Sequence, residues 1–361
     1  MAETEPVSCN ALVVCRCLGK EYSVRDAVDA ALFRGGLVSI WKEFICNLSA
    51  QERAHERDHE LNDDAVNEMA ELFRYDHDLI TAEETEHWLQ QRGLTLEDFS
   101  DHFARKYWRT AVEDVSVQEA DLVSADARLR ELFTIELIFA GELDRLAKQL
   151  MWRLAALAAN AQVEEDAIAT ERQRFLDRIK IKPVSLDAWL GNIDRNEEWL
   201  TEMLAMEVAY RGACEAALTP HARQKQLALL RMPLALFEAE AIQLESLDAA
   251  KEALLCIRQD GMSLEEVAAD ARYPHRRISF RHEDVPSDLQ QKFWSVGPGD
   301  LLDPIAHGDG FELFRIIKKS EPDLRDKIVQ ERIDQRLLEQ HFSRLVHDHV
   351  EVRWGEAGGL Q

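Results

Sequence analysis

The stretch SFRHEDVPSDLQQKFWSVGPGDLLDPIAHGDGFELFRIIKK, residues 279–319, decides the fold that this sequence predicts. Its first part predicts a short amphipathic helix over residues 284–294. Val285, Leu289 and Phe293 recur there at the spacing of one helix face. The prediction therefore places three apolar side chains together on one side of the helix.

The residues after this helix predict a β-hairpin. Residues 297–300, Gly-Pro-Gly-Asp, break the chain, and residues 301–305 are apolar and extended. Pro304 favours an edge position in a sheet, because proline cannot donate a hydrogen bond to a neighbouring strand. Residues 307–310, His-Gly-Asp-Gly, predict a tight turn, and residues 311–318 predict the closing strand because they are rich in aromatic and branched side chains.

This order resembles the second half of a parvulin-type peptidyl-prolyl isomerase domain. Residues 237–246 are similar to the first strand of such a domain, and residues 247–258 and 263–271 to its first two helices, with the parvulin-like phrase GMSLEEVA at 261–268. The resemblance covers roughly residues 237–320, under a quarter of the chain. In the second half it is carried by Leu289, Phe293, Gly299, Pro304, Ile305, Gly310 and Phe311.

The departures from the parvulin pattern concern its catalytic histidines. Parvulins place one His on the first strand and one on the last, and here Ala241 and Glu312 occupy these positions. Residues 272–279 bridge the second helix to the next part of the domain in place of the usual Gly-rich turn. His275 and His282 are alternatives as replacement histidines, but we favour surface-loop positions for both. The resemblance therefore leaves the catalytic residues unknown.

The resemblance implies an apolar cup that holds a proline. Isomerisation needs no nucleophile, because its barrier of about 18–20 kcal/mol comes from amide resonance. Because both usual histidines are replaced, we expect a peptide-binding chaperone first, an active isomerase as the alternative, and a purely structural subunit as the third class. No cofactor and no metal are expected. The pocket would be lined by Leu289, Phe293, Ile305, Phe311 and Leu313.

Charge and composition limit the class of partner. The 361 residues carry a formal net charge of -25, which repels nucleic-acid phosphates and anionic membrane surfaces. No apolar run is close in length to the about 20 residues that a helix needs to span a bilayer. Residues 1–10 lack the pattern of a signal peptide. Six cysteines without a C-x-x-C pair indicate free thiols. We expect a cytoplasmic protein that binds a peptide or an unfolded or precursor protein, in maturation or export of a peptide product, with oligomerisation left open.

The rest of the chain predicts helices, so the expected fold is mainly α with a small α+β parvulin-like domain. A strand over 11–18 and a helix over 24–33 are similar to the start of SurA-type chaperones, and a strand over 350–354 would pair with residues 12–17 as in that family. We expect a SurA-like helical N-terminal domain (1–124), a second helical module (125–235), the parvulin-like domain (236–320) and a C-terminal helix and strand packing back on the first domain (321–361). The second module is either a duplication of the first or an unrelated pair of helical hairpins.

One motif matches a metal site by its letters. His55-Glu56-Arg57-Asp58-His59 fits H-E-x-x-H, in which two histidines one turn apart on a helix bind zinc. Arg57 and Asp58 are charged, and the surrounding run is polar within a helix predicted over residues 50–74. We therefore favour a solvated helix face over a metalloprotease site. His347-Asp348-His349 is likewise read as a polar helix end.

Overall fold

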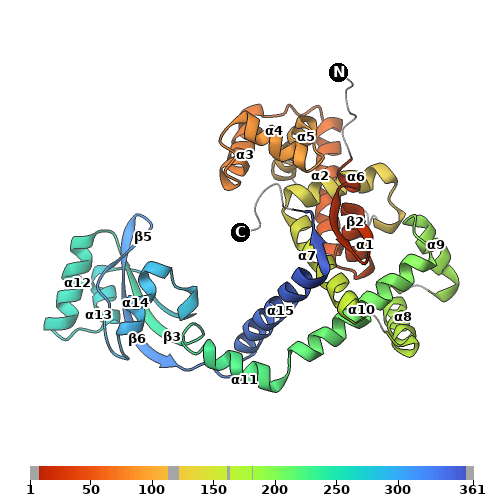
Figure 1. Ribbon diagram of the computed structural model, residues 1–361. Helices are drawn as coiled ribbons and strands as arrows, with labels where there is room; N and C mark the ends of the chain where they lie inside the picture. Colours follow the sequence, from red (N-terminus) through yellow and green to blue (C-terminus); the bar gives the residue numbers. More distant parts are fainter. Residues whose placement is uncertain (1–7, 113–121, 161–162, 181, 355–361) are drawn as a thin grey trace. The chain divides into compact units, whose positions relative to one another are not determined.

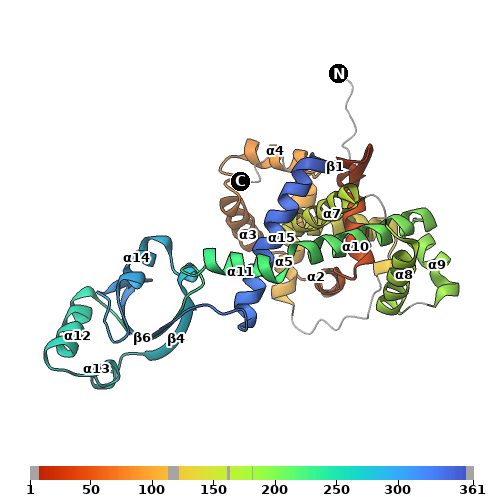
Figure 2. The same ribbon diagram turned by 60° about the horizontal axis from the view of Figure 1, so that its bottom comes forward.

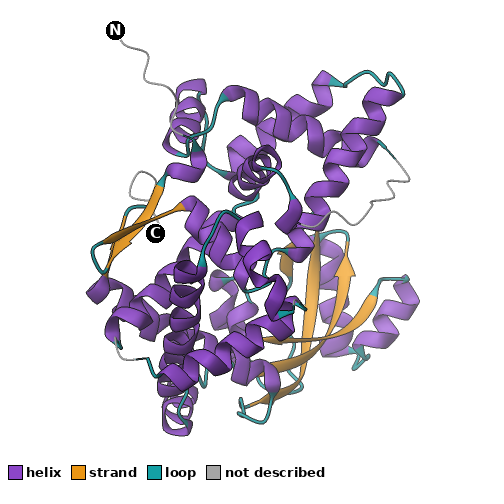
Figure 3. Ribbon diagram, turned by 90° about the vertical axis from the view of Figure 1, so that its right-hand side faces the viewer, coloured by secondary structure: helices purple, strands orange, loops and turns teal. Residues whose placement is uncertain are grey.

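The computed structural model describes residues 8–112, 122–160, 163–180 and 182–354. Its contacts divide the chain into two compact units, unit 1 (Met1–Glu215 and His341–Gln361) and unit 2 (Ala216–Gln340). Helices dominate the described chain, and the strands form two small antiparallel sheets (Figure 3). The prediction of a mainly α fold with a small α+β part is confirmed.

Unit 1 holds the first ten α-helices of the described chain. In order these are α1 (Val24–Phe33), α2 (Val38–Glu56), α3 (Asp63–Asp76), α4 (Ala82–Gln91), α5 (Leu96–Ala111), α6 (Ala127–Phe139), α7 (Glu142–Ala159), α8 (Glu165–Ile179), α9 (Leu186–Asn192) and α10 (Glu197–Ala217), the last of which crosses the unit boundary. Short 3-10 turns are η1 (Cys9–Ala11), η2 (Leu122–Ser124) and η3 (Pro183–Ser185).

Local capping sets several of these helix starts. Ser23, Thr81 and Thr95 each accept a hydrogen bond from the third helical backbone N–H, and the acidic residue at that position bonds back to the cap. Each such cap satisfies backbone donors that a helix start leaves unpaired. Because each capping box involves residues only three positions apart, the starts of α1, α4 and α5 can be predicted from the sequence.

The three-stranded sheet of unit 1 joins the two ends of the described chain. Its strands β1 (Val13–Cys17), β2 (Lys20–Ser23) and β7 (Val350–Val352) lie in the order β2-β1-β7, with Cys17 opposite Val350. Helix α15 (Lys327–His349) leads into β7 (Figure 1). Its Phe342 stacks on Trp152 of α7 at 4.8 Å between ring centroids. The predicted pairing of the final strand with residues 12–17 is confirmed.

Two predictions about unit 1 are corrected. The single helix expected over residues 50–74 is two helices, because α2 ends at Glu56 and Asp58 takes a left-handed conformation at φ 51°. The expected boundary at residue 124 also falls inside one core. Phe133 of α6 packs edge-on against Trp41 of α2, with ring centroids 5.0 Å apart, so the helices before and after residue 124 share their packing.

Unit 2 contains the four-stranded antiparallel sheet β4-β3-β6-β5. Figures 1 and 2 show α12 and α13 on one side of this sheet and α14 on the other. The elements in chain order are α11 (Pro220–Leu229), β3 (Leu236–Leu244), α12 (Leu247–Gln259), α13 (Leu264–Ala271), β4 (His275–Arg281), the 3-10 turn η4 (His282–Asp284), α14 (Ser287–Ser295), β5 (Ile305–His307) and β6 (Gly310–Ser320).

Strand β4 corrects the prediction that residues 272–279 only bridge two elements. Its basic residues do not show the apolar alternation that predicts a strand. In the sheet Arg277 pairs with Glu240, and Arg276 pairs with Glu312. Ion pairs to β3 and to β6 beyond it therefore replace part of the apolar packing that a sequence pattern detects.

Gly310 begins β6 where the backbone of β3 lies closest. A methyl group on its Cα would lie 2.4 Å from the carbonyl oxygen of Leu244, so the two strands would have to separate. We expect Gly310→Ala to destabilise the protein by about 1–3 kcal/mol, the usual range for forcing an extra methyl into a packed site. Thermal unfolding of the full chain measures this loss. Gly212→Ala is the control, because its added methyl meets nothing within 4 Å. Equal stability of the two variants would contradict the close approach.

Candidate functional site

The structure places the five predicted pocket residues on two faces of the unit 2 sheet. Leu289, Phe293 and Ile305 pack on the α14 face. Phe311 and Leu313 pack on the opposite face, with α12 and α13. Side chains alternate between faces along a strand, so the odd-numbered residues of β6 cannot reach the face that Phe314 and Ile316 occupy. The five residues therefore do not line one pocket.

On the α14 face, Phe293 is a core residue and Leu289 is the more accessible one. Phe293 is 3% exposed, and its ring lies edge-on to Phe280 and Phe314 at centroid distances of 5.2 and 5.3 Å. Leu289 is only partly buried at the edge of the same cluster. A peptide on this face would therefore contact Leu289 rather than Phe293.

Ala241 and Glu312, the two positions where the parvulin pattern has histidines, both lie close to Arg276. Sequence analysis did not single out this arginine. Ala241 of β3 lies opposite Arg276 of β4 on one side and opposite Phe314 of β6 on the other. The Arg276 guanidinium forms an ion pair with the carboxylate of Glu312, on the far side of β3. Because Ala241 carries only a methyl group, the long Arg276 side chain has room to cross the strand. We name the cluster Arg276–Ala241–Glu312 the β3 crossing.

The β3 crossing combines a fixed charge pair with an available donor. The Glu312 side chain is 5% exposed, whereas that of Arg276 is 51% exposed. A guanidinium carries five N–H donors, and one nitrogen suffices for the bond to Glu312. Arg276 can therefore donate to the carbonyl oxygen of a bound peptide while the buried carboxylate holds it in place. The only sequence signal for this role is the basic run His275-Arg276-Arg277 in an acidic chain.

The side chains of His282 and His275, the two histidines considered as replacements, both lie away from the β3 crossing. His282 is 5% exposed, and its Nε2 lies 2.9 Å from the carbonyl oxygen of Gln290 in α14. It therefore ties η4 to α14. His275 lies opposite Ile242, a residue of the α12 and α13 face, so its side chain is on the other side of the sheet from Arg276. The expectation that both are surface-loop residues is wrong, since His282 is buried and His275 begins a strand.

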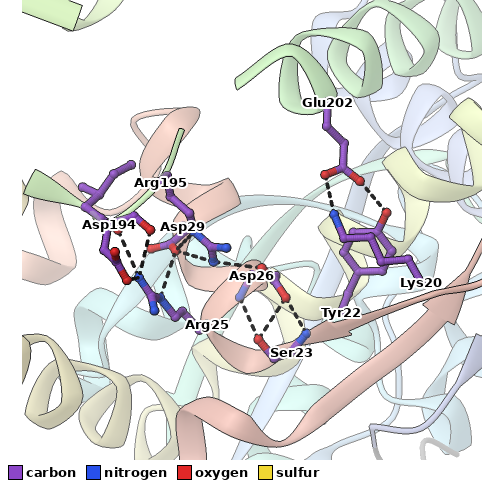
Figure 4. Close-up of polar contacts among 10 residues, drawn as sticks. Lys20, Tyr22, Ser23, Arg25, Asp26, Asp29, Asp194, Arg195 and Glu202 are labelled. Carbon is purple, nitrogen blue, oxygen red and sulfur yellow. Dashed lines mark hydrogen bonds and ion pairs between the residues drawn. The ribbon is translucent and has the colours of Figure 1, made fainter. Parts of the chain in front are cut away.

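In unit 1, one polar group ties α1 to the residues before α10, and a second ties β2 to α10 (Figure 4). Arg195 donates to Asp29 at 2.7 Å and to Asp26 at 2.8 Å, and the Tyr22 hydroxyl donates to Glu202 at 2.6 Å. Burial raises the pKa of Asp29, and the Arg195 charge acts against that rise. The groups satisfy one another, so we interpret this network as a structural clamp.

A second charged cluster lies buried between α5 and α6. Glu136 accepts from Arg105 Nε at 2.8 Å, and its other carboxylate oxygen lies 2.8 Å from His102 Nδ1. Burial acts to raise the pKa of Glu136, but the hydrogen bond and charge of His102 and the charge of Arg105 outweigh it and lower the pKa. The three residues span a separation of 34 positions, and nothing in the local sequence marks them as a group.

The H-E-x-x-H match lacks the helix on which zinc binding depends. Helix α2 ends at Glu56, so His55 and His59 do not lie one turn apart on a helix. Within residues 8–112, 122–160, 163–180 and 182–354, no group of three or more His, Cys, Asp or Glu side chains is placed to hold a metal ion. The structure also describes no helix with the length and apolar character needed to cross a bilayer.

Comparisons with known proteins find similar chains among solved structures. No protein-family model and no curated protein matches the chain. A solved structure titled peptidylprolyl isomerase (PrsA) from Bacillus cereus is similar at 12% identity and a TM-score of 0.37, over 59% of this chain and 85% of that one. The foldase protein PrsA from Streptococcus pneumoniae matches at 14% identity and a TM-score of 0.26, over 64% and 93%.

A third similar structure comes from Campylobacter jejuni. It belongs to work on PEB4 and Cj1289, titled two structurally related SurA-like chaperones, and matches at 11% identity and a TM-score of 0.20, over 60% of this chain and 88% of that one. The chain is similar to parvulin-type chaperones of the PrsA and SurA-like kind. The residues of the parvulin resemblance form the unit 2 sheet with α12, α13 and α14, where positions 241 and 312 carry Ala and Glu.

Proposed function

We propose that this protein is a cytoplasmic peptide-binding chaperone of the parvulin type, whose client lies on the α14 face of unit 2. The observation that supports the proposal best is the β3 crossing, in which buried Glu312 fixes the half-exposed guanidinium of Arg276. A peptide carbonyl accepts a hydrogen bond from Arg276, and a proline or aliphatic side chain covers Leu289. The clients are unfolded or precursor polypeptides, including a peptide product in maturation or export. Six free cysteines accord with a reducing compartment.

Peptide binding fits this cluster better than isomerase chemistry does. A rotating X-Pro amide loses its resonance, so a catalyst must stabilise a twisted amide that is less dipolar than the planar one. An apolar wall at Leu289 would act in this direction, which keeps the isomerase as the second candidate. A hydrogen bond from Arg276 to the carbonyl oxygen of the same amide would favour the planar, more dipolar form, so it supports binding and not rotation. The negative charge of Glu312, however, is neutralised by Arg276, and no pair of histidines shares a proton there.

The binding proposal is tested with a variant of Leu289. We expect Leu289→Ala to weaken binding of a labelled proline-containing peptide about 5- to 30-fold, since about 1–2 kcal/mol of apolar contact is lost. Fluorescence anisotropy with the full chain gives the affinity. Leu255→Ala is the matched control, because Leu255 is 52% exposed on α12 and faces away from α14.

The outcomes separate the three classes of function. Equal affinities of the Leu289→Ala and Leu255→Ala variants would place the client elsewhere on the protein. Absence of saturable binding by the unmodified chain would favour a structural subunit. Accelerated cis-trans exchange of the same peptide, lost in the Leu289→Ala variant, would establish the isomerase in place of a chaperone without catalysis.

A further inference from the structure

Helix α3 of unit 1 presents apolar side chains to solvent on the face opposite its core. Val66 and Phe73 form the inner face, and the Phe73 ring lies 5.6 Å from that of Phe103 in α5. On the outer face Leu72 is 58% exposed and Tyr75 is 69% exposed. These two residues are three positions apart, so their side chains are neighbours on the helix.

A third exposed apolar side chain, that of Ile80, follows the end of α3. Arg74 donates from Nε to the carbonyl oxygen of Leu79 at 3.1 Å and from Nη2 to that of Ile80 at 2.8 Å. The two bonds hold the turn after α3 against its last residues. Ile80, which is 73% exposed, belongs to this turn. We name Leu72, Tyr75 and Ile80 the α3 surface. Exposed apolar side chains gathered in one region of a surface are a feature of interaction sites.

Carboxylates continue the same stripe of α3. Asp64, Glu68 and Glu71 precede Leu72 at helical spacing, and all three side chains are exposed. No ion pair among the described residues involves Glu68 or Glu71.

Unit 1 as a whole is also negatively charged. Residues 216–340 contain 17 Lys and Arg against 22 Asp and Glu, so most of the net charge of -25 belongs to unit 1. The α3 surface is therefore an apolar patch that lies beside negative charge on a strongly negative unit.

We propose that the α3 surface binds a basic amphipathic segment of the client polypeptide. Apolar side chains of the segment cover Leu72, Tyr75 and Ile80, and its Lys or Arg residues face Glu68 and Glu71. Nucleic acids and anionic lipid surfaces are excluded as occupants, because they carry negative charge like unit 1 itself. This inference names the chemistry of the client in the proposed function. It uses a different surface from Leu289, so the two proposals can fail separately.

The test compares two labelled helical peptides that share one apolar face, with Lys or with Glu on the polar face. Binding to the full chain is followed by anisotropy at low and at high salt. We expect saturable binding of the Lys peptide, weakened at high salt because screening shortens the reach of the charges. The Glu peptide is expected to bind at least about tenfold more weakly, or not at all.

Variants assign this binding to the α3 surface. Leu72→Ser with Tyr75→Ser is expected to weaken the Lys peptide about tenfold or more, and Glu68→Gln with Glu71→Gln to reduce its salt dependence. Val184→Ser is the control for an exposed apolar residue of unit 1, at 89% exposure.

Three results would overturn the inference: no binding of the Lys peptide, equal binding of both peptides, or an unchanged affinity in the Leu72 and Tyr75 double variant. A loss in the Leu289→Ala variant alone, with the α3 variants unaffected, would assign the Lys peptide to unit 2. Binding retained in the Leu289→Ala variant and lost in the α3 variants would support the α3 surface, whether or not the proline-containing peptide binds unit 2.

Discussion

A Glu136→Gln variant is expected to unfold with a free energy about 3–5 kcal/mol lower than that of the unmodified protein. Glu136 is the only carboxylate found within ion-pair distance of Arg105 inside the core of the described part of unit 1, at 2.7 Å from Nη2. Arg105 is 3% exposed, so an amide at position 136 leaves its buried positive charge with only the exposed carboxylate of Asp101, 4.0 Å away, as a counter-ion. Denaturant unfolding followed by tryptophan fluorescence measures the loss, because seven of the eight tryptophans lie in unit 1.

An exposed partner of the same arginine provides the control. Asp101 Oδ2 lies 4.0 Å from Arg105 Nη1, and the Asp101 side chain is 56% exposed. Water screens such a pair, so Asp101→Asn is expected to cost at most about 1 kcal/mol. If the Glu136 and Asp101 variants lost the same stability, the buried cluster would contribute no more than a surface ion pair.

Phe293→Ala is expected to destabilise unit 2 by about 3–5 kcal/mol, the range for removing a large buried aromatic side chain. The ring fills the space between the sheet and α14, where it meets Phe237, Phe280 and Phe314. Loss of peptide binding in this variant would report unfolding and not a lost contact. Leu289 is for this reason the residue that tests the binding site.

Hydrogen exchange of the β3 amides measures the Phe293 effect within unit 2. These amides should exchange faster in Phe293→Ala and remain near the original rate in Leu255→Ala, since Leu255 is half exposed on α12. Unchanged protection of β3 in the Phe293 variant would show that the helix does not close this core.

Local features of the fold were predictable from the sequence because neighbouring residues determine them. Ser23 and Thr81 start helices through bonds to residues three positions away. Gly141, at φ 69°, separates α6 from α7 where the helical pattern breaks. The pairing of the final strand with β1 is different, since no local rule selects a partner more than 330 residues away. The resemblance to SurA-type chaperones supplied it.

The candidate site was less predictable because it depends on register and on distant pairs. Phe311 and Leu313 have the right chemistry for an apolar pocket, but their position along β6 assigns them to the other face. Arg276 was overlooked because its role depends on Glu312, 36 positions away, and on the small side chain of Ala241 between them. Charge alone could not show that a basic connector becomes an edge strand.

The junction of β1 with β7 has a consequence for how the chain is made. A ribosome adds Val350–Val352 after residues 216–340, so unit 2 is synthesised before the third strand of the unit 1 sheet. Until β7 pairs with it, β1 offers an open edge to other chains. A nascent molecule therefore passes through a stage in which it is itself a candidate for the help that chaperones give.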